Sequence, residues 1–194
     1  VTHYNFDNNN QLVSLDSDAT PSGFCIAANK HYSYYPSGDK HTETDWLGNV
    51  RELSYDAAGL LASRIEAKGT PSERKTSFIW EHNSRKLLSE RVSGKDAQGL
   101  LQAIHETIYS YNSEGRLASR QERDLTAHNS PDRIWSYNYS YWNAEKTQLR
   151  TMSMDGPRTD VSDITVSEYD NQGRLISLTN SEGHQSLLSD FDAF

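Results

Sequence analysis

The 194-residue sequence predicts an all-β protein built from tandem β-hairpins, with little or no helix. Three observations lead to this prediction. Short β-like runs are separated by loops rich in Ser, Asn, Gly and Pro, one run alternates between aromatic and polar residues, and a seven-residue motif recurs along the chain.

The composition indicates a folded chain with a thin core. Leu, Ile, Val and Phe make up 36 of 194 residues, just below the roughly 20% under which a charged chain is suspected of disorder. Aromatic residues, which disordered chains lack, nevertheless reach 10%, with 11 Tyr and 4 Trp. We therefore expect part of the burial to come from neighbours outside the chain, and the isolated segment to be marginally stable or self-associated.

Charge and hydropathy exclude several classes of protein. The net charge of −8 and the scattered basic residues argue against a nucleic-acid partner. The longest apolar run, residues 24–28, is too short for a membrane span, and we expect no export signal within this sequence. The single Cys25 excludes an internal disulfide and, in its apolar setting, is expected to be an inert buried thiol.

The recurring motif is an aromatic residue, Asp or Asn, two free positions, Gly or Asn, one free position, and Leu. Residues 55–64 and 111–120 align without gaps, residues 169–175 repeat the scheme, and residues 34–40 keep its Tyr and Gly. Residues 6–12 are a variant with Asn in place of Gly, and residues 82–88 are a worn copy. The residues expected to hold the repeats together are Tyr34, Gly38, Tyr55, Asp56, Gly59, Leu61, Tyr111, Asn112, Gly115, Leu117, Tyr169, Asp170, Gly173 and Leu175.

Each position of the motif has a physical explanation. The Asp or Asn side chain can cap the turn, and Gly or Asn three residues later can adopt the positive φ that a tight hairpin requires. The aromatic residue ends one strand and Leu begins the next; that both face the same layer is a supposition. A second turn of the same type recurs at 45–48, 96–99 and 180–183. We therefore predict a single array of about seven two-turn repeats over residues 1–194, with the last one truncated.

Two longer runs are predicted to be strands. Residues 100–108 have helical spacing, but they continue without a stop into a Tyr-Ser-Tyr run, and we predict a strand. Residues 134–141 alternate with period two, which places Trp135, Tyr137, Tyr139 and Tyr141 on one face. This face is either core or a platform that stacks on sugar rings. Core is favoured, because Tyr is the main apolar material of the chain.

The motif, together with Thr44, Asp45, Trp46, Leu47 and Gly48 between two of its copies, resembles the tyrosine-aspartate (YD) repeats of the bacterial Rhs family, shared with toxin-complex C components and teneurins. The resemblance implies hairpins joined into a long curved antiparallel sheet, a segment of a spiral β-shell that encloses a C-terminal toxin domain. The partners it implies are that domain and neighbouring repeats of a larger secreted or surface-delivered bacterial protein. Unpaired strand edges are also expected to favour self-association.

No motif for catalysis stands out. The sequence has no nucleophile elbow, phosphate-binding loop or dinucleotide fingerprint. We expect no cofactor, no metal and no enzymatic activity. Two alternatives stay open: a carbohydrate-binding or adhesion module that uses the aromatic face, and a glycosidase in which two of Glu43, Asp45, Glu52 and Glu168 meet in the fold.

Overall fold

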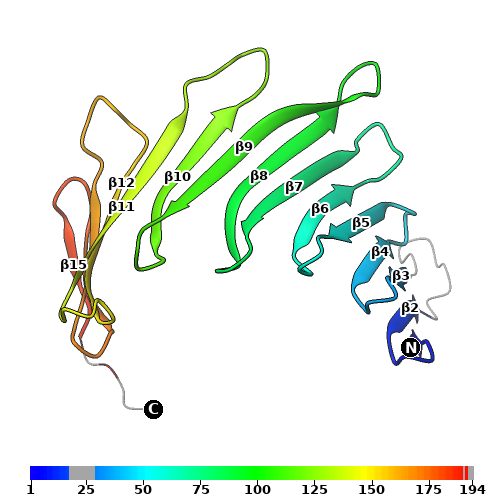
Figure 1. Ribbon diagram of the computed structural model, residues 1–194, viewed down its shortest axis with the longest axis horizontal. Coiled ribbons are helices and arrows are strands. Elements are labelled where there is room, and N and C mark those ends of the chain that lie inside the picture. Colours follow the sequence, from blue (N-terminus) through cyan, green and yellow to red (C-terminus); the bar gives the residue numbers. More distant parts are fainter. Residues whose placement is uncertain (18–28, 190, 192–194) are drawn as a thin grey trace. The chain divides into compact units, whose positions relative to one another are not determined.

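The computed structural model describes residues 1–17, 29–189 and 191. The all-β prediction is confirmed: these residues form fifteen strands and no helix, and the strands follow one another in chain order within the sheet (Figure 1). Every strand pair whose register is given is antiparallel. No described segment is a helix with the length and apolar character needed to cross a bilayer.

The chain divides into two compact units, Val1–Glu106 and Thr107–Phe194. Strand β9 (Leu101–Tyr111) runs across the boundary between them. The first unit contains β1 (Thr2–Phe6), β2 (Leu12–Ser17), β3 (Lys30–Tyr34), β4 (Lys40–Thr44), β5 (Val50–Tyr55), β6 (Leu61–Glu66), β7 (Arg74–Glu81) and β8 (Lys86–Lys95). The second unit contains β10 (Leu117–Asp124), β11 (Arg133–Tyr141), β12 (Leu149–Asp155), β13 (Thr165–Tyr169), β14 (Leu175–Thr179) and β15 (Gln185–Leu187).

Both runs assigned to strands by their pattern are strands. Residues 101–108 lie in β9 and residues 134–141 lie in β11. In β11 the aromatic residues are half-buried and the residues between them are exposed, as the period of two predicts. Cys25 lies outside the described residues.

The motif positions meet across the hairpins through a bulge. Tyr55 lies opposite Leu61, and Tyr169 lies opposite Leu175, each immediately after a register shift in the ladder. Directly opposed residues of an antiparallel pair project from the same face of the sheet. The extra residue of the bulge therefore lets the aromatic residue and the Leu share one face, which counting along the sequence could not decide.

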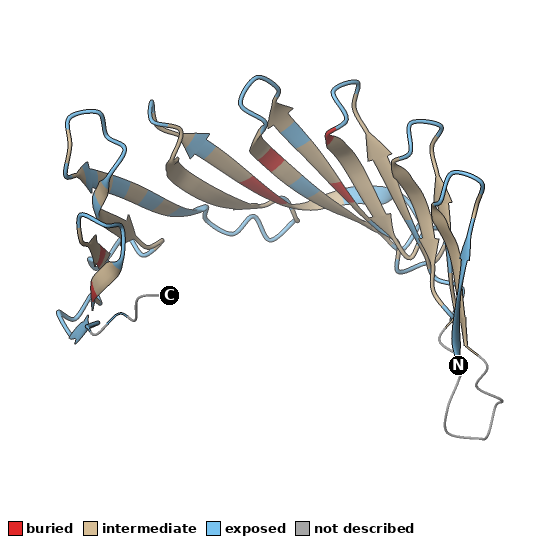
Figure 2. Ribbon diagram, turned by 90° about the horizontal axis from the view of Figure 1, so that it is seen from below, coloured by how far each residue is buried: buried red, intermediate tan, exposed pale blue. Residues whose placement is uncertain are grey.

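Very little of the sheet is buried. Figure 2 shows most of the strands as intermediate or exposed. Among the described apolar residues only Leu60 is buried, at 7% exposure. The other buried residues are polar: Thr76, Ser89, Glu106, Thr107, Ser167 and Ser177. The sheet therefore has the thin core that the composition predicts.

Candidate functional site: the repeat turns and the aromatic strand

Asp56 organises the turn between β5 and β6. Its Oδ1 accepts hydrogen bonds from the backbone N–H groups of Ala58 and Leu60, both at 2.9 Å. The backbone N–H of Gly59 donates to the Asp56 carbonyl at 3.0 Å, and Gly59 has φ of +74°. This is a type I turn closed by a residue in the left-handed region, a common hairpin connection.

The same arrangement recurs in both kinds of turn. A side-chain oxygen accepts the backbone N–H four residues later in the turns that begin at Asp7, Asp45, Asp56, Asp96, Asn112, Asp170 and Asn180. The glycines predicted for the motif have positive φ: 92° at Gly38, 74° at Gly59, 79° at Gly115 and 82° at Gly173. The turns of the second kind at Asp45, Asp96 and Asn180 are therefore chemically equivalent to the capped motif turns, whereas residues 67–73, 125–132 and 156–164 form longer connections.

These hydrogen bonds stabilise the charged form of the turn carboxylates. The hydrogen bond from the N–H of Leu60 does most to lower the pKa of Asp56, and His82 and the N–H of Ala58 lower it further. The N–H of Arg174 likewise lowers the pKa of Asp170. Each carboxylate holds its turn in its charged form, which is the form present at neutral pH. A structural role therefore explains why these acidic residues are there.

The alignment of residues 82–88 with the motif was wrong, by two residues at the aromatic and capping positions and by one residue at the positive-φ and Leu positions. The turn begins at Glu81, whose carboxylate accepts the N–H groups of Asn83 and Ser84, and Arg85 takes the positive φ of 54°. The aromatic anchor is Trp80, which lies opposite Leu87 after a register shift. A Glu side chain performs here the task that Asp or Asn performs elsewhere, so the motif rule could not find it.

Aromatic side chains also connect three of the hairpins to the hairpin before them. The Tyr34 hydroxyl donates to the carbonyl of Leu12 at 2.8 Å, Trp80 Nε1 donates to that of Leu61 at 2.8 Å, and the Tyr139 hydroxyl donates to that of Leu117 at 2.8 Å. In all three cases the acceptor is the first residue of the preceding hairpin's second strand. Burial raises the pKa of Tyr34 and of Tyr139.

A row of hydroxyl pairs lies next to the bulges and was missed by the sequence reasoning. The paired side-chain oxygens lie 2.6–2.7 Å apart in Ser33–Thr42, Ser54–Ser63, Ser110–Ser119 and Ser140–Thr151. A signal for it was present in the sequence. Ser or Thr stands two residues after the Leu position of every hairpin, at 14, 42, 63, 89, 119, 151 and 177.

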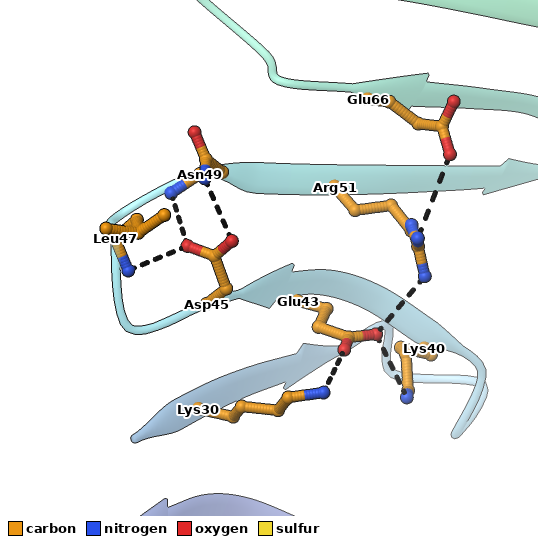
Figure 3. A network of polar contacts seen from close by, with 8 residues as sticks. All are labelled: Lys30, Lys40, Glu43, Asp45, Leu47, Asn49, Arg51 and Glu66. Carbon is orange, nitrogen blue, oxygen red and sulfur yellow. Dashed lines mark hydrogen bonds and ion pairs between the residues drawn. The ribbon is translucent and has the colours of Figure 1, made fainter. Parts of the chain in front are cut away.

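An alternating ladder of charges crosses β3 to β6 (Figure 3). Glu43 is half-buried between Lys30 at 3.4 Å and Arg51 at 3.7 Å, and Arg51 also lies 3.7 Å from Glu66. Glu43 pairs with Arg51, whereas Glu52 pairs with Thr42, the neighbour of Glu43. Glu43 and Glu52 therefore project from opposite faces of the sheet, and this pair of the glycosidase alternative does not meet.

Guanidinium groups cover the aromatic strand β11. The Arg120 and Arg133 guanidinium carbons lie 4.7 and 4.9 Å from the ring centre of Trp135. Arg116 lies 5.6 Å from the ring centres of both Tyr139 and Tyr141. A sugar that stacked on these rings would have to compete with cations already placed on them.

Two further residues predicted from the sequence, Tyr111 and Tyr137, lie in strands β9 and β11. Tyr111 ends β9, and burial raises its pKa. Tyr137 lies opposite Met154 on the neighbouring strand β12. Within the described part of the chain, no group of three or more His, Cys, Asp and Glu side chains is arranged to hold a metal ion.

Comparison with known proteins gives distant likenesses of fold. No protein-family model matches the chain, and no curated protein sequence matches it. A Photorhabdus luminescens Tc holotoxin pore structure aligns over 88% of this chain and 10% of its own, with 15% identity and a TM-score of 0.40. A TcdB2-TccC3-TEV structure aligns over 95% and 13%, with 14% identity and a TM-score of 0.35.

A porin-like protein from Bacteroides uniformis aligns over 95% of this chain and 86% of its own, with 12% identity and a TM-score of 0.44. The chain spans only about a tenth of the length of the two toxin structures. These likenesses assign no family, so membership of the Rhs family remains a prediction from the repeat motif.

Proposed function

We propose that this chain is a non-catalytic structural segment, one stretch of a β-shell wall that encloses a toxin domain lying outside these residues. The observation that carries the proposal is the use of the motif side chains. Asp56 and Gly59 shape a turn, Leu61 pairs with Tyr55 across it, and Trp80 ties the next hairpin to the Leu61 carbonyl. The repeated residues are thus engaged in connecting strands to strands.

A wall of this kind grows by repetition. Several of the described hairpins share a capped turn, a bulge and a contact to the neighbouring hairpin, so adding repeats extends the sheet without a larger core. The resemblance of the motif to Rhs repeats supports the same role and adds the partner, a C-terminal toxin domain of the parent protein. It also implies delivery outside the producing cell as part of that larger protein.

The mechanism we propose is sequestration. A sheet that surrounds a domain keeps it from solvent, proteases and the producer's own targets until release. The wall needs no reactive group for this, because only its continuity matters.

The test is limited proteolysis of the complete gene product that contains this chain, combined with electron microscopy. We expect a hollow particle whose enclosed domain resists protease. The variant Gly59→Val places a β-branched residue at φ +74° and should expose that domain to cleavage, whereas Gly94→Ala, at a strand glycine with room for a methyl group, should leave it protected. An extended particle with a fully accessible downstream domain would refute the proposal.

A further inference from the structure

The gap between the turns at residues 35–39 and 56–60 contains a cavity of about 440 Å³ in the first unit. Its wall is aromatic and acidic. Tyr35 and Pro36 lie on one side and Tyr55 on the other, and the carboxylates of Asp39 and Asp56 also line it. No Lys, Arg or His lines this cavity.

The two rings are held in place. The Tyr35 hydroxyl donates to the Leu53 carbonyl at 3.0 Å, and the Tyr35 and Tyr55 rings meet edge to face with centres 6.2 Å apart. His41 packs on Tyr35 with ring centres 4.4 Å apart. Burial raises the pKa of Tyr55, and the nearby charge of Asp39 raises it further. The second effect agrees with a carboxylate beside this ring.

Two other gaps between successive motif turns are each bridged by a basic side chain. His82 reaches the carboxylate of Asp56 at 3.1 Å in the next gap along the first unit. In the second unit Lys146 reaches Glu114 at 2.6 Å, again from one turn to the turn before it. A basic side chain thus bridges adjacent turns at both places.

Asp39 has no such partner. Its Oδ2 accepts a hydrogen bond from the Ser37 hydroxyl at 2.9 Å, and it forms no ion pair with any residue in the described parts of the chain. The Ser37 and Ser54 hydroxyls that line the cavity are engaged, Ser37 with Asp39 and Ser54 with Ser63. The polar groups left for a ligand are therefore mainly acceptors.

We propose that this cavity binds an alkylammonium group, seated against the Tyr35 and Tyr55 rings with its charge next to Asp39. A cation is attracted both to the faces of aromatic rings and to a carboxylate, and it would supply the positive group that His82 and Lys146 supply in two other gaps. A sugar fits less well, since its hydroxyls would need donors as well as acceptors. The site is independent of the proposed wall function.

The ammonium group could belong to a free amine or to a lysine side chain of another polypeptide. The test is an NMR titration of the whole chain carrying ¹³C-labelled Tyr. The probes are choline chloride, n-butylammonium chloride and a lysine capped at both ends. The neutral choline isostere 3,3-dimethyl-1-butanol and sodium chloride at matched ionic strength are the controls.

We expect saturable shifts of the Tyr35 and Tyr55 ring signals by the cations, with dissociation constants of about 1–10 mM, and none by the neutral isostere. Asp39→Asn keeps the shape of the side chain and should weaken binding about 5- to 10-fold. Glu182→Gln, at an exposed turn acid of the second unit, should change nothing. Capped lysine binding at least as tightly as butylammonium identifies a polypeptide as the source, and weaker binding identifies a free amine.

A second variant tests the same site without a ligand. Ser37→Lys places a tethered ammonium at the edge of the cavity, so it should abolish the choline shifts and raise the melting temperature. The proposal is overturned if no cation shifts these rings at about 50 mM, if the neutral isostere binds equally well, or if Asp39→Asn binds as tightly as the parent chain.

Discussion

Replacement of Gly59 by Ala isolates the energetic role of the turn. Gly59 has φ of +74°, and a Cβ built on it meets no atom within 4 Å. The substitution therefore adds no clash, and its cost is that of holding an L-residue in the left-handed region, roughly 1–2 kcal/mol. Ala also loses less chain entropy on folding than Gly, which offsets about 0.4–1 kcal/mol of it. We expect a net loss of about 1 kcal/mol.

Two other positions of the chain, Asn10 and Gly94, allow the cost of a substitution at Gly59 to be compared. Asn10 occupies the equivalent place in the first hairpin with φ of 59°, so Gly59→Asn should destabilise less than Gly59→Ala. Gly94 lies in β8 without positive φ, and a Cβ there would make an ordinary contact with Ile104 Cδ1 at 3.8 Å. Gly94→Ala should therefore change stability by less than about 0.5 kcal/mol.

Urea unfolding followed by tryptophan fluorescence, with thermal melts by circular dichroism, measures these differences. A loss of 1 kcal/mol corresponds to a decrease of about 2–4 °C in melting temperature for a chain of this size. The argument fails if Gly59→Ala and Gly94→Ala are equally stable, or if Asn is worse than Ala at position 59. Either result would mean that backbone conformation does not set the energy of this turn.

Four further predictions follow. Tyr139→Phe removes the hydroxyl that donates to the preceding hairpin and should lower the free energy of unfolding by about 1 kcal/mol; equal losses for Tyr137→Phe would contradict this. The turn carboxylates have pKa values lower in the folded than in the unfolded chain, so their stabilisation is complete above about pH 4 and lost as the pH falls through the folded values. Melting temperature should therefore drop steeply below about pH 4, less so in Asp56→Asn, and a flat profile would oppose it. On a glycan array we expect no binding, and reproducible binding that Trp135→Ala abolishes would establish the carbohydrate alternative. The exposed edge strand β1 should self-associate, so sedimentation velocity should depend on concentration and Tyr4→Lys should reduce that dependence; a concentration-independent parent chain would rule this out.

The turns could be predicted because their determinants are local. Asp56 caps backbone groups two and four residues ahead, and Gly59 sits where the backbone needs a positive φ, which Gly adopts without strain. Both requirements are visible as residue types at fixed spacing, and no distant part of the chain is needed to meet them. The strand assignment of β9 followed for a similar reason, since the run had no helix stop.

The connections between hairpins could not be predicted in the same way. The bulge before Tyr55 changes which residues share a face, and nothing in the spacing of the motif reveals a bulge. The bonds of Trp80 and Tyr139 depend on which strand lies alongside, because their acceptors are backbone carbonyls that any residue could supply. Glu81 was missed because its longer side chain accepts the N–H groups two and three residues ahead, in place of the Asp or Asn of the motif.

The scarcity of Leu, Ile, Val and Phe is a consequence of how this sheet is held together. Leu60 alone among the described apolar residues is buried, so hydrophobic burial within the chain contributes little per repeat. Backbone ladders, capped turns and hydroxyl pairs supply order, but each adds only about 0.5–1.5 kcal/mol net, since water competes for every group. A sheet stabilised in this way gains most when another surface covers it. The apolar side chains left half-open, Trp135 among them, are therefore the part of the sequence that a wall with an enclosed partner would use and an isolated sheet would not.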